Sequence, residues 1–292
     1  MSLCRSFLNL VLNHPSRLIV SAITRICPEA FFKLIYSTQR GKFKKPVFSL
    51  SFDCDFIEDV KVIPKILEKL KQYSIRADFA CIGSLIKKFP KEHKAILQQG
   101  HEIINHTYSH PSHEILNPKK RFNELSAAEQ KEEITKCHRI CQKILEYEPT
   151  GFRIPHFAAL YTKTIYSILR KLGYKYSSSI EITKAGGHAE PFMIENILEF
   201  PLSVCPKHPF TTFETYHSFL RGGGFHAKRG AFFKLFQVLI ETGIKSKTYM
   251  NIYFDPQDMA DNEDFDNILE LLDKKRDAIE IKTYEDFISG QE

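Results

Sequence analysis

The chain has 292 residues, of which 43% are apolar and 26% are charged, a composition typical of a folded globular protein rather than of a disordered or membrane-embedded one. This length suits a single α/β barrel built around one core. The net charge is +6, but residues 1–45 hold eight Lys or Arg against one acid, so the body is nearly neutral and offers no basic groove for nucleic acid.

Residues 1–45 form a basic stretch in which Pro15 and Pro28 separate short amphipathic pieces. No run nears the roughly 20 apolar residues that a bilayer span requires, and Pro15 and Arg17 interrupt what would be the apolar core of a signal peptide. We therefore expect a cytoplasmic protein with a helical extension over 1–45 and a catalytic domain over 46–292. The extension either packs on the domain or rests on anionic lipid at the inner membrane surface.

After Lys45, short apolar runs alternate with amphipathic segments, which indicates parallel βα units. The expected strands are 47–52, 77–82, 101–105, 152–155, 175–178, 197–202, 250–254 and 279–282. The expected helices are 60–73, 84–98, 126–145, 162–172, 229–242 and 262–275. About seven such units predict an α/β fold, a distorted and incomplete (β/α)7-type barrel with an N-terminal helical extension.

The chain contains seven cysteines, an odd number, and none of them forms a CxxC pair. This spacing predicts no zinc site of the usual thiol type. We expect reduced and mostly buried thiols, as is common in cytosolic proteins.

Several polar residues follow predicted strands directly. In a parallel βα barrel the carboxyl ends of the strands share one face, where catalytic groups gather. We therefore expect one site to contain the following residues: Asp53, Asp55, His106, His110, Arg153 and Asp255.

Two imidazoles and one carboxylate are a common ligand set for a catalytic zinc ion, and iron, cobalt or nickel would also suit them. His106, His110 and Asp55 supply such a set, and a bound ion would polarise a carbonyl and acidify water. Asp53 lies two positions before Asp55, so strand alternation sends both side chains to the same face, where Asp53 can accept a proton.

Each of these residues also has an ordinary structural explanation. A pair of histidines three residues apart is often no ligand pair at all, and an aspartate after a strand is often only the N-cap of the next helix. Arg153 could simply pair with a surface acid. The conjunction of all of them at strand ends favours the functional interpretation.

Three segments resemble motifs of the polysaccharide deacetylases, the NodB-homology or carbohydrate esterase family 4 group. They are SFDCD over 51–55, GHEIINHTYSHP over 100–111 and FRIP over 152–155, and the middle one is highly specific. The resemblance extends over roughly 47–258 and weakens after Pro155.

The resemblance implies a distorted (β/α) barrel that removes acetyl groups from sugars with a divalent metal. By position, Asp53 would be the base, and Asp55, His106 and His110 the metal ligands. Arg153 would orient and tune the base, and the backbone N–H of His156 would help to bind the oxyanion.

The chain departs from the family in the segment 251–256, NIYFDP, which has Asp255 where the family has the histidine that protonates the leaving amine. A carboxylic acid can do this only if its pKa is raised, by burial or by a like charge such as Asp53. The histidines at positions 156, 188 and 226 are other candidates for the proton donor.

We therefore predict a metal-dependent hydrolase that removes an N-acetyl or other N-acyl group from an amino sugar of a glycan or lipid-linked saccharide. The first alternative is an inert metal-containing pseudo-enzyme that binds carbohydrate, as the replacement at Asp255 would allow. The second is a related C–N hydrolase that acts on a small cyclic amide.

Overall fold

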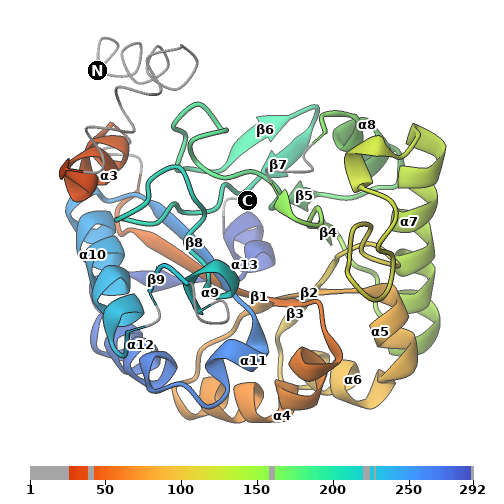
Figure 1. The fold of residues 1–292 in the computed structure, drawn as a ribbon, viewed down its shortest axis with the longest axis horizontal. Coiled ribbons are helices and arrows are strands. Elements are labelled where there is room, and N and C mark those ends of the chain that lie inside the picture. The colour runs from red at the N-terminus through yellow and green to blue at the C-terminus, as the bar shows by residue number, and fades with distance from the viewer. Residues whose placement is uncertain (1–25, 39–42, 158–161, 220–223, 227, 291–292) are drawn as a thin grey trace.

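The computed structural model of the protein describes residues 26–38, 43–157, 162–219, 224–226 and 228–290. Strands occupy the centre and helices form an outer ring around much of them, as predicted for a distorted barrel (Figure 1). The strands are β1 (Val47–Cys54), β2 (Asp78–Cys81), β3 (Glu102–Asn105), β4 (Gly151–Phe152), β5 (Tyr176–Ser177), β6 (Phe192–Ile194), β7 (Ile197–Glu199), β8 (Tyr249–Phe254) and β9 (Glu280–Ile281). The helices are α3 (Pro28–Ser37), α4 (Ile57–Gln72), α5 (Gly83–Lys88), α6 (Pro90–Gln98), α7 (Ala127–Ile140), α8 (Thr164–Lys171), α9 (Thr215–Phe219), α10 (Ala231–Ser246), α11 (Pro256–Met259), α12 (Glu263–Lys274) and α13 (Tyr284–Ser289).

The sheet has the strand order β6-β7-β5-β4-β3-β2-β1-β8, and β9 pairs with β1. All pairings are parallel except the β6–β7 hairpin. Within the described residues no strand ladder joins β7 to β8. Instead, the gap is bridged by two hydrogen bonds, from the Ser203 N–H to the Asn251 carbonyl (2.7 Å) and from the Asn251 N–H to the Ser203 hydroxyl (3.1 Å). The barrel is therefore incomplete, as the sequence predicted.

Strand β1 lies between β2 and β8 in the sheet and is buried along its whole length. Its even-numbered residues, such as Phe48 and Phe52, pack outward in the core cluster shared with α4, α10 and α12. Its odd-numbered residues face the barrel interior, where Val47 packs in the same cluster as Tyr284 and Phe287 of α13. Alternation along one strand thus gives the domain an apolar outer core and an interior that ends in polar side chains.

Three differences from the sequence prediction have local causes. The helix expected over 84–98 is divided into α5 and α6 because Pro90 begins α6 and Phe89 is not helical. The helix expected over 126–145 begins with the Ser126 capping box but ends in a π-helical turn over Cys141–Leu145. Strand β6 was not predicted, because its three residues carry too little pattern to signal a strand.

The described part of the basic extension contains α3, whose apolar side chains Phe32, Ile35 and Tyr36 are fully buried. The Tyr36 hydroxyl lies 2.7 Å from that of Ser203, so α3 is fastened to the segment after β7. This helix therefore packs on the domain. The lipid-binding prediction for the extension now depends on residues 1–25, which lie outside the described residues. Within the described part of the chain, the helices are too short or too polar to cross a membrane.

Candidate active site

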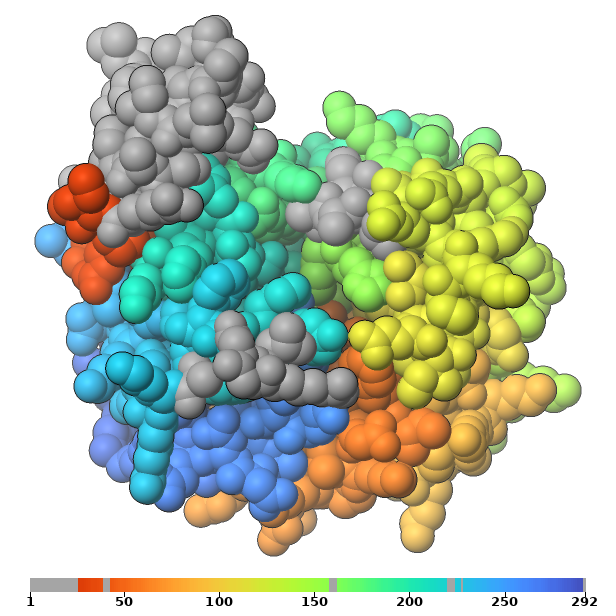
Figure 2. Space-filling view, viewed as in Figure 1, coloured from red at the N-terminus to blue at the C-terminus, as the bar shows by residue number. Residues whose placement is uncertain are grey.

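The carboxyl ends of β1, β4 and β8 and the loop after β3 surround a cavity of about 440 Å³. A volume of this order is usual for a small-molecule site. In Figure 2 a hollow lies near the centre of the molecule, between teal, green and orange segments. The cavity is lined by Asp53, Asp55, Phe56, His110, Ser112, His113, Glu114, His156, Phe157, Glu181, Lys184, Phe210, Thr211, Thr212, Tyr216, His217, Tyr253 and Asp255.

Asp55, His106 and His110 come together at one corner of this cavity. The His106 Nε2 lies 3.3 Å from one carboxylate oxygen of Asp55, and the His110 Nε2 lies 3.4 Å from the other. Both histidines are almost fully buried. The structure therefore assembles the three predicted ligands, with potential ligand atoms of all three within 4.8 Å of one another.

The loop after β3 takes this shape through short side-chain hydrogen bonds. The Asn105 side chain accepts a hydrogen bond from the Thr107 N–H (2.9 Å), and the Thr107 hydroxyl accepts one from the His110 N–H (3.1 Å). Thr107 and His110 both have positive φ angles, of 66° and 50°. Positive φ angles are energetically unfavourable for residues other than glycine. The hydrogen bonds therefore hold the loop in a conformation that places the two imidazoles side by side.

The ring of His106 is oriented by a partner outside the ligand set. Its Nδ1 lies 2.8 Å from the Arg153 carbonyl oxygen, so Nδ1 carries the proton and the lone pair of Nε2 is available to bind a cation beside Asp55. This arrangement is the usual way in which a metal-binding histidine is fixed.

His113 plays a part that the sequence did not reveal. Its Nε2 donates to the Asp55 backbone carbonyl (2.8 Å), and its Nδ1 accepts from the Ile115 and Leu116 N–H groups. His113 therefore holds the backbone of Asp55 in place. His101 does not take part in this site. Its Nδ1 accepts a hydrogen bond from the Ala77 N–H at the amino ends of β2 and β3, whereas the cavity lies at the carboxyl ends of the strands.

The donor atoms of this cluster fit a divalent cation. Among the described residues, the buried Asp55 Oδ1, His106 Nε2 and both ring nitrogens of His110 have no hydrogen-bond partner. Buried polar atoms are normally satisfied, so their convergence indicates a missing central partner. Burial opposes the charge of Asp55, but His110 and His106 outweigh it and lower the pKa of this carboxyl, which keeps it anionic as a ligand must be.

Asp53 lies beside this cluster and is held by Arg153. The Arg153 guanidinium donates to Asp53 at 2.5 Å and also to the Ser51 hydroxyl, the Ser178 carbonyl and hydroxyl, and the Tyr284 hydroxyl. Arg153 is fully buried, and these groups together accept hydrogen bonds from its guanidinium. Burial raises the pKa of Asp53, whereas Arg153 opposes that effect and favours the carboxylate.

His156 and Phe157 follow Arg153 at the cavity wall, both with positive φ angles, of 54° and 42°. Backbone strain of this kind costs on the order of 1–3 kcal/mol per residue and is typical of functional sites. The ring of His156 packs against that of His110, with centroids 4.7 Å apart. The ring of His156 therefore lies next to the cluster of Asp55, His106 and His110.

Asp255 follows β8 and lines the same cavity. It occupies the N-cap position of α11, but its side chain makes no capping hydrogen bond. Asp55 does not cap α4 either, because Asp59 accepts from the N–H groups of Asp55 and Phe56 instead. The simple N-cap explanation fails for both residues.

Burial raises the pKa of Asp255 well above its ordinary value, and the neighbouring carboxylates of Asp59, Asp55 and Glu214 raise it further. Asp53, the like-charged neighbour expected from the sequence, is not among the main causes. A carboxyl in such surroundings is suited to hold a proton.

Of the three histidines considered as other proton donors, His156 lines the cavity, whereas His188 packs on Phe192 and His226 lies beside Cys205. The sequence missed His217, which also lines the cavity and whose Nδ1 lies 2.5 Å from a Glu214 oxygen. The hydrogen bond to Glu214 raises the pKa of His217. In the sequence, the only signal for His217 is that Glu214 lies three residues before it.

Part of the chain is similar to known proteins. The sequence profile of the family described as polysaccharide deacetylase matches residues 40–177. The chain is 35% identical over 116 residues to the peptidoglycan-N-acetylglucosamine deacetylase of Bacillus cereus, which covers 40% of this chain and 38% of that protein. It is 33% identical over 92 residues to the peptidoglycan-N-acetylmuramic acid deacetylase PdaC of Bacillus subtilis, which covers 32% of this chain and 18% of that protein. The matched segments thus span less than two fifths of either relative.

Solved structures share the fold over a longer stretch. A candidate polysaccharide deacetylase from Mycobacterium smegmatis superposes with a TM-score of 0.70 at 14% identity, covering 85% of this chain and 91% of that one. A CE4 family pseudoenzyme from Bacillus anthracis gives a TM-score of 0.53 at 16% identity, covering 84% of this chain and 66% of that one. Identities this low show the fold alone, whereas the profile match includes every proposed metal ligand. Residues 40–177, slightly less than half of the chain, therefore match the polysaccharide deacetylase family.

Proposed function

We propose that this protein is a metal-dependent hydrolase that removes an N-acetyl or other N-acyl group from an amino sugar of a glycan or lipid-linked saccharide. One observation carries the proposal, namely the meeting of Asp53 with the cluster of Asp55, His106 and His110 at a single cavity. The activities of the peptidoglycan deacetylases of Bacillus cereus and Bacillus subtilis, to which the chain is similar, support it.

Asp55, His106 and His110 would hold the ion. A divalent cation with these ligands, most simply zinc, with iron, cobalt or nickel also compatible, would polarise the acyl carbonyl and make water more acidic when bound. Asp53 stands beside this position as the general base that takes the proton of the attacking water. Arg153 holds the Asp53 carboxylate at 2.5 Å, so the base is oriented before the substrate arrives.

The later steps of the reaction would involve His156 and Asp255. The backbone N–H of His156 would donate to the oxygen that becomes negative as water adds to the carbonyl. Asp255 would then give its proton to the leaving nitrogen, which releases the amine of the sugar. The raised pKa of Asp255 supports this role, because a general acid must be protonated at the working pH.

The pseudo-enzyme alternative has a specific observation in its favour, since Asp255 replaces the family's histidine. A variant of the Bacillus anthracis pseudoenzyme is described as having restored enzymatic activity. If our protein were inert for the same kind of reason, Asp255→His would gain activity over the natural chain.

We test the function with the full chain loaded with zinc or cobalt. Acetate release is measured from N-acetylglucosamine oligomers, peptidoglycan fragments and lipid-linked sugars, and a small cyclic amide serves as the substrate of the remaining alternative. Asp53→Asn should abolish release because it removes the base, and Asp255→His should lower it. Gain of activity in Asp255→His over an inert natural chain would establish the pseudo-enzyme, and release of acyl groups from no sugar would overturn the proposal.

The place of action is part of the same proposal. We propose action in the cytoplasm, on substrates at the inner membrane surface, with residues 1–25 in contact with anionic lipid. The basic residues of that segment, Arg5, Arg17 and Arg25, support this placement. The fraction of protein that floats with anionic vesicles should fall when these three arginines are replaced by Gln. Equal binding of the natural chain and of the variant would contradict the proposed lipid contact.

A further inference from the structure

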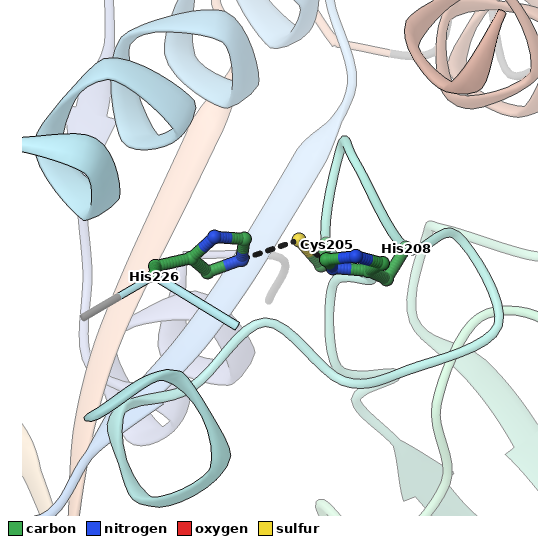
Figure 3. Close-up of side chains that lie close together, drawn as sticks. All are labelled: Cys205, His208 and His226. Carbon is green, nitrogen blue, oxygen red and sulfur yellow. Dashed lines mark hydrogen bonds between the residues drawn. The ribbon is translucent and has the colours of Figure 1, made fainter. Parts of the chain in front are cut away.

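A second cluster of potential metal ligands lies outside the profile match, at Cys205, His208 and His226 (Figure 3). The Cys205 sulfur is 3.2 Å from the His226 Nε2 and 3.7 Å from the His208 Nδ1. In Figure 3 the sulfur lies between the two imidazole rings, with one ring nitrogen of each close to it. Cys205 and His226 are buried, and His208 is partly buried.

These distances match those expected around one ion. Zinc bonds of about 2.3 Å to sulfur and about 2.0–2.1 Å to nitrogen, set at tetrahedral angles, separate a sulfur and a nitrogen ligand by about 3.6 Å. The two sulfur–nitrogen distances lie on either side of this value. Each sulfur–nitrogen distance differs from the expected value by only a few tenths of an ångström, and all the potential ligand atoms lie within 4.8 Å of one another.

Hydrogen bonding alone accounts poorly for the same arrangement. A thiol has one proton, so it can donate to only one of the two ring nitrogens that face it. The second imidazole would then have to donate its N–H to sulfur, which is a weak acceptor. A thiolate and two neutral imidazoles converging on one point are a ligand set that suits zinc, and they leave one tetrahedral position for water.

The backbone brings the ligands together from two segments. Cys205 and His208 lie on a tight turn in which the Cys205 N–H donates to the Thr211 carbonyl (2.8 Å) and the His208 N–H donates to the Cys205 carbonyl (3.1 Å). His226 precedes α10, and its N–H donates to the Ser218 carbonyl (2.9 Å). The turn continues into Phe210, Thr211 and Thr212, which line the cavity of the candidate active site.

We propose that Cys205, His208 and His226 form a second zinc site, with three protein ligands, that connects the cavity-lining turn over 205–212 to the segment before α10. This inference is independent of the proposed function, because it concerns ligands that do not line the cavity. Its role would be to stabilise one wall of the cavity.

The proposal is tested with the full chain and cobalt as a spectroscopic probe. Cobalt bound to a thiolate gives a sulfur-to-metal charge-transfer band in the near ultraviolet, which a site of one carboxylate and two imidazoles cannot give. The band should appear in the natural chain and in the double variant Asp55→Ala/His110→Ala, but not in Cys205→Ser. Cys27→Ser is the matched control, because Cys27 is an exposed free cysteine.

Zinc content gives a second measurement. The natural chain should retain about two zinc ions after dialysis, and Cys205→Ser and Asp55→Ala/His110→Ala about one each, since each change disrupts one of the two ligand sets. His226→Gln repeats the test if Cys205→Ser fails to fold. Zinc should also protect Cys205 from alkylation in the natural chain. Absence of the charge-transfer band, or unchanged zinc content in the Cys205 and His226 variants, would mean that the cluster is only a hydrogen-bonded one.

Discussion

Arg153 and Asp53, separated by 100 positions in the chain, meet in the barrel interior through a hydrogen bond of 2.5 Å between guanidinium and carboxylate. Both side chains are almost fully buried. The same guanidinium also donates to Ser51, Ser178 and Tyr284, so Arg153 connects β1, the end of β5 and the start of α13 to the proposed catalytic base.

Replacing Arg153 with Met should therefore destabilise the fold, because Asp53 would be left buried without its cation. Breaking a buried pair in this way costs roughly 3–5 kcal/mol. Urea unfolding measures the loss. Asp53→Asn should cost less than Arg153→Met, and the double variant Asp53→Asn/Arg153→Met should cost less than the sum of the two. Additive losses would show that the two residues do not interact.

Removal of metal should lower stability through Asp55, His106 and His110. A ligand present at a hundredfold excess over its dissociation constant stabilises the folded state by about 2.7 kcal/mol. Thermal unfolding of the Cys205→Ser protein with and without a chelator isolates this site from the second cluster. In that background His110→Gln should remove most of the zinc-dependent shift, and a shift that persists in full would exclude His110 as a ligand.

The proton donor can be identified from the pH dependence of kcat. A general acid must be protonated, so the rate should fall as pH rises through its raised pKa. Asp255→Asn should lower kcat by roughly 10²–10⁴-fold and flatten this alkaline limb. His217→Gln should leave the limb in place. If His217→Gln removes the limb and Asp255→Asn does not, the donor is His217 and its pair with Glu214 takes the role proposed for Asp255.

A buried carboxyl pair at the other end of the barrel predicts a pH dependence of stability. Asp78 and Glu102 share a hydrogen bond, and burial raises the pKa of Asp78 to about 7 and that of Glu102 well above its ordinary value. Because these folded pKa values exceed those of the unfolded chain, the pair's contribution is complete below the ordinary carboxyl pKa. It is lost as pH rises through about 7 for Asp78.

Asp78→Asn should reduce this dependence, because the amide donates the shared hydrogen bond without titrating. Urea unfolding between mildly acidic and mildly alkaline pH would show a smaller fall in the free energy of unfolding than in the natural chain. Asp261→Asn, at an exposed position, is the control that should leave the slope unchanged. An identical slope in Asp78→Asn would contradict the shared proton.

The strand that leads to Arg153 should tolerate no added side chain at Gly151. A Cβ there would lie 2.0 Å from the ring of Tyr176, a rigid side chain packed against Phe200 and Tyr284. Gly151→Ala should therefore cost about 1–3 kcal/mol through overpacking. Gly243→Ala meets the Met250 side chain at a similar distance but should cost less, because methionine can change rotamer. Equal losses in urea unfolding would show that Tyr176 yields as easily as Met250.

The sequence alone was enough to predict most of the alternating strands and helices and the edge of the sheet where Asp53, Asp55, His106 and His110 gather. Period-two alternation along β1 and the rule that parallel strands end on one face are local or general constraints, so they can be read without coordinates. The short strand β6 and the break before Pro90 show the limits of such patterns, because a few residues carry too weak a signal to fix an element's boundary.

Only the tertiary structure decided which side chains meet across large sequence separations. His113 holds the backbone of Asp55, and Cys205 meets His226 from a different segment, although neither pairing has a characteristic spacing. The burial of Asp255 and the neighbouring carboxylates, which raise its pKa, were likewise decided only by the tertiary structure. Contacts of this kind depend on how the elements pack, and the physical reason is that burial and charge act through distance in space rather than distance along the chain.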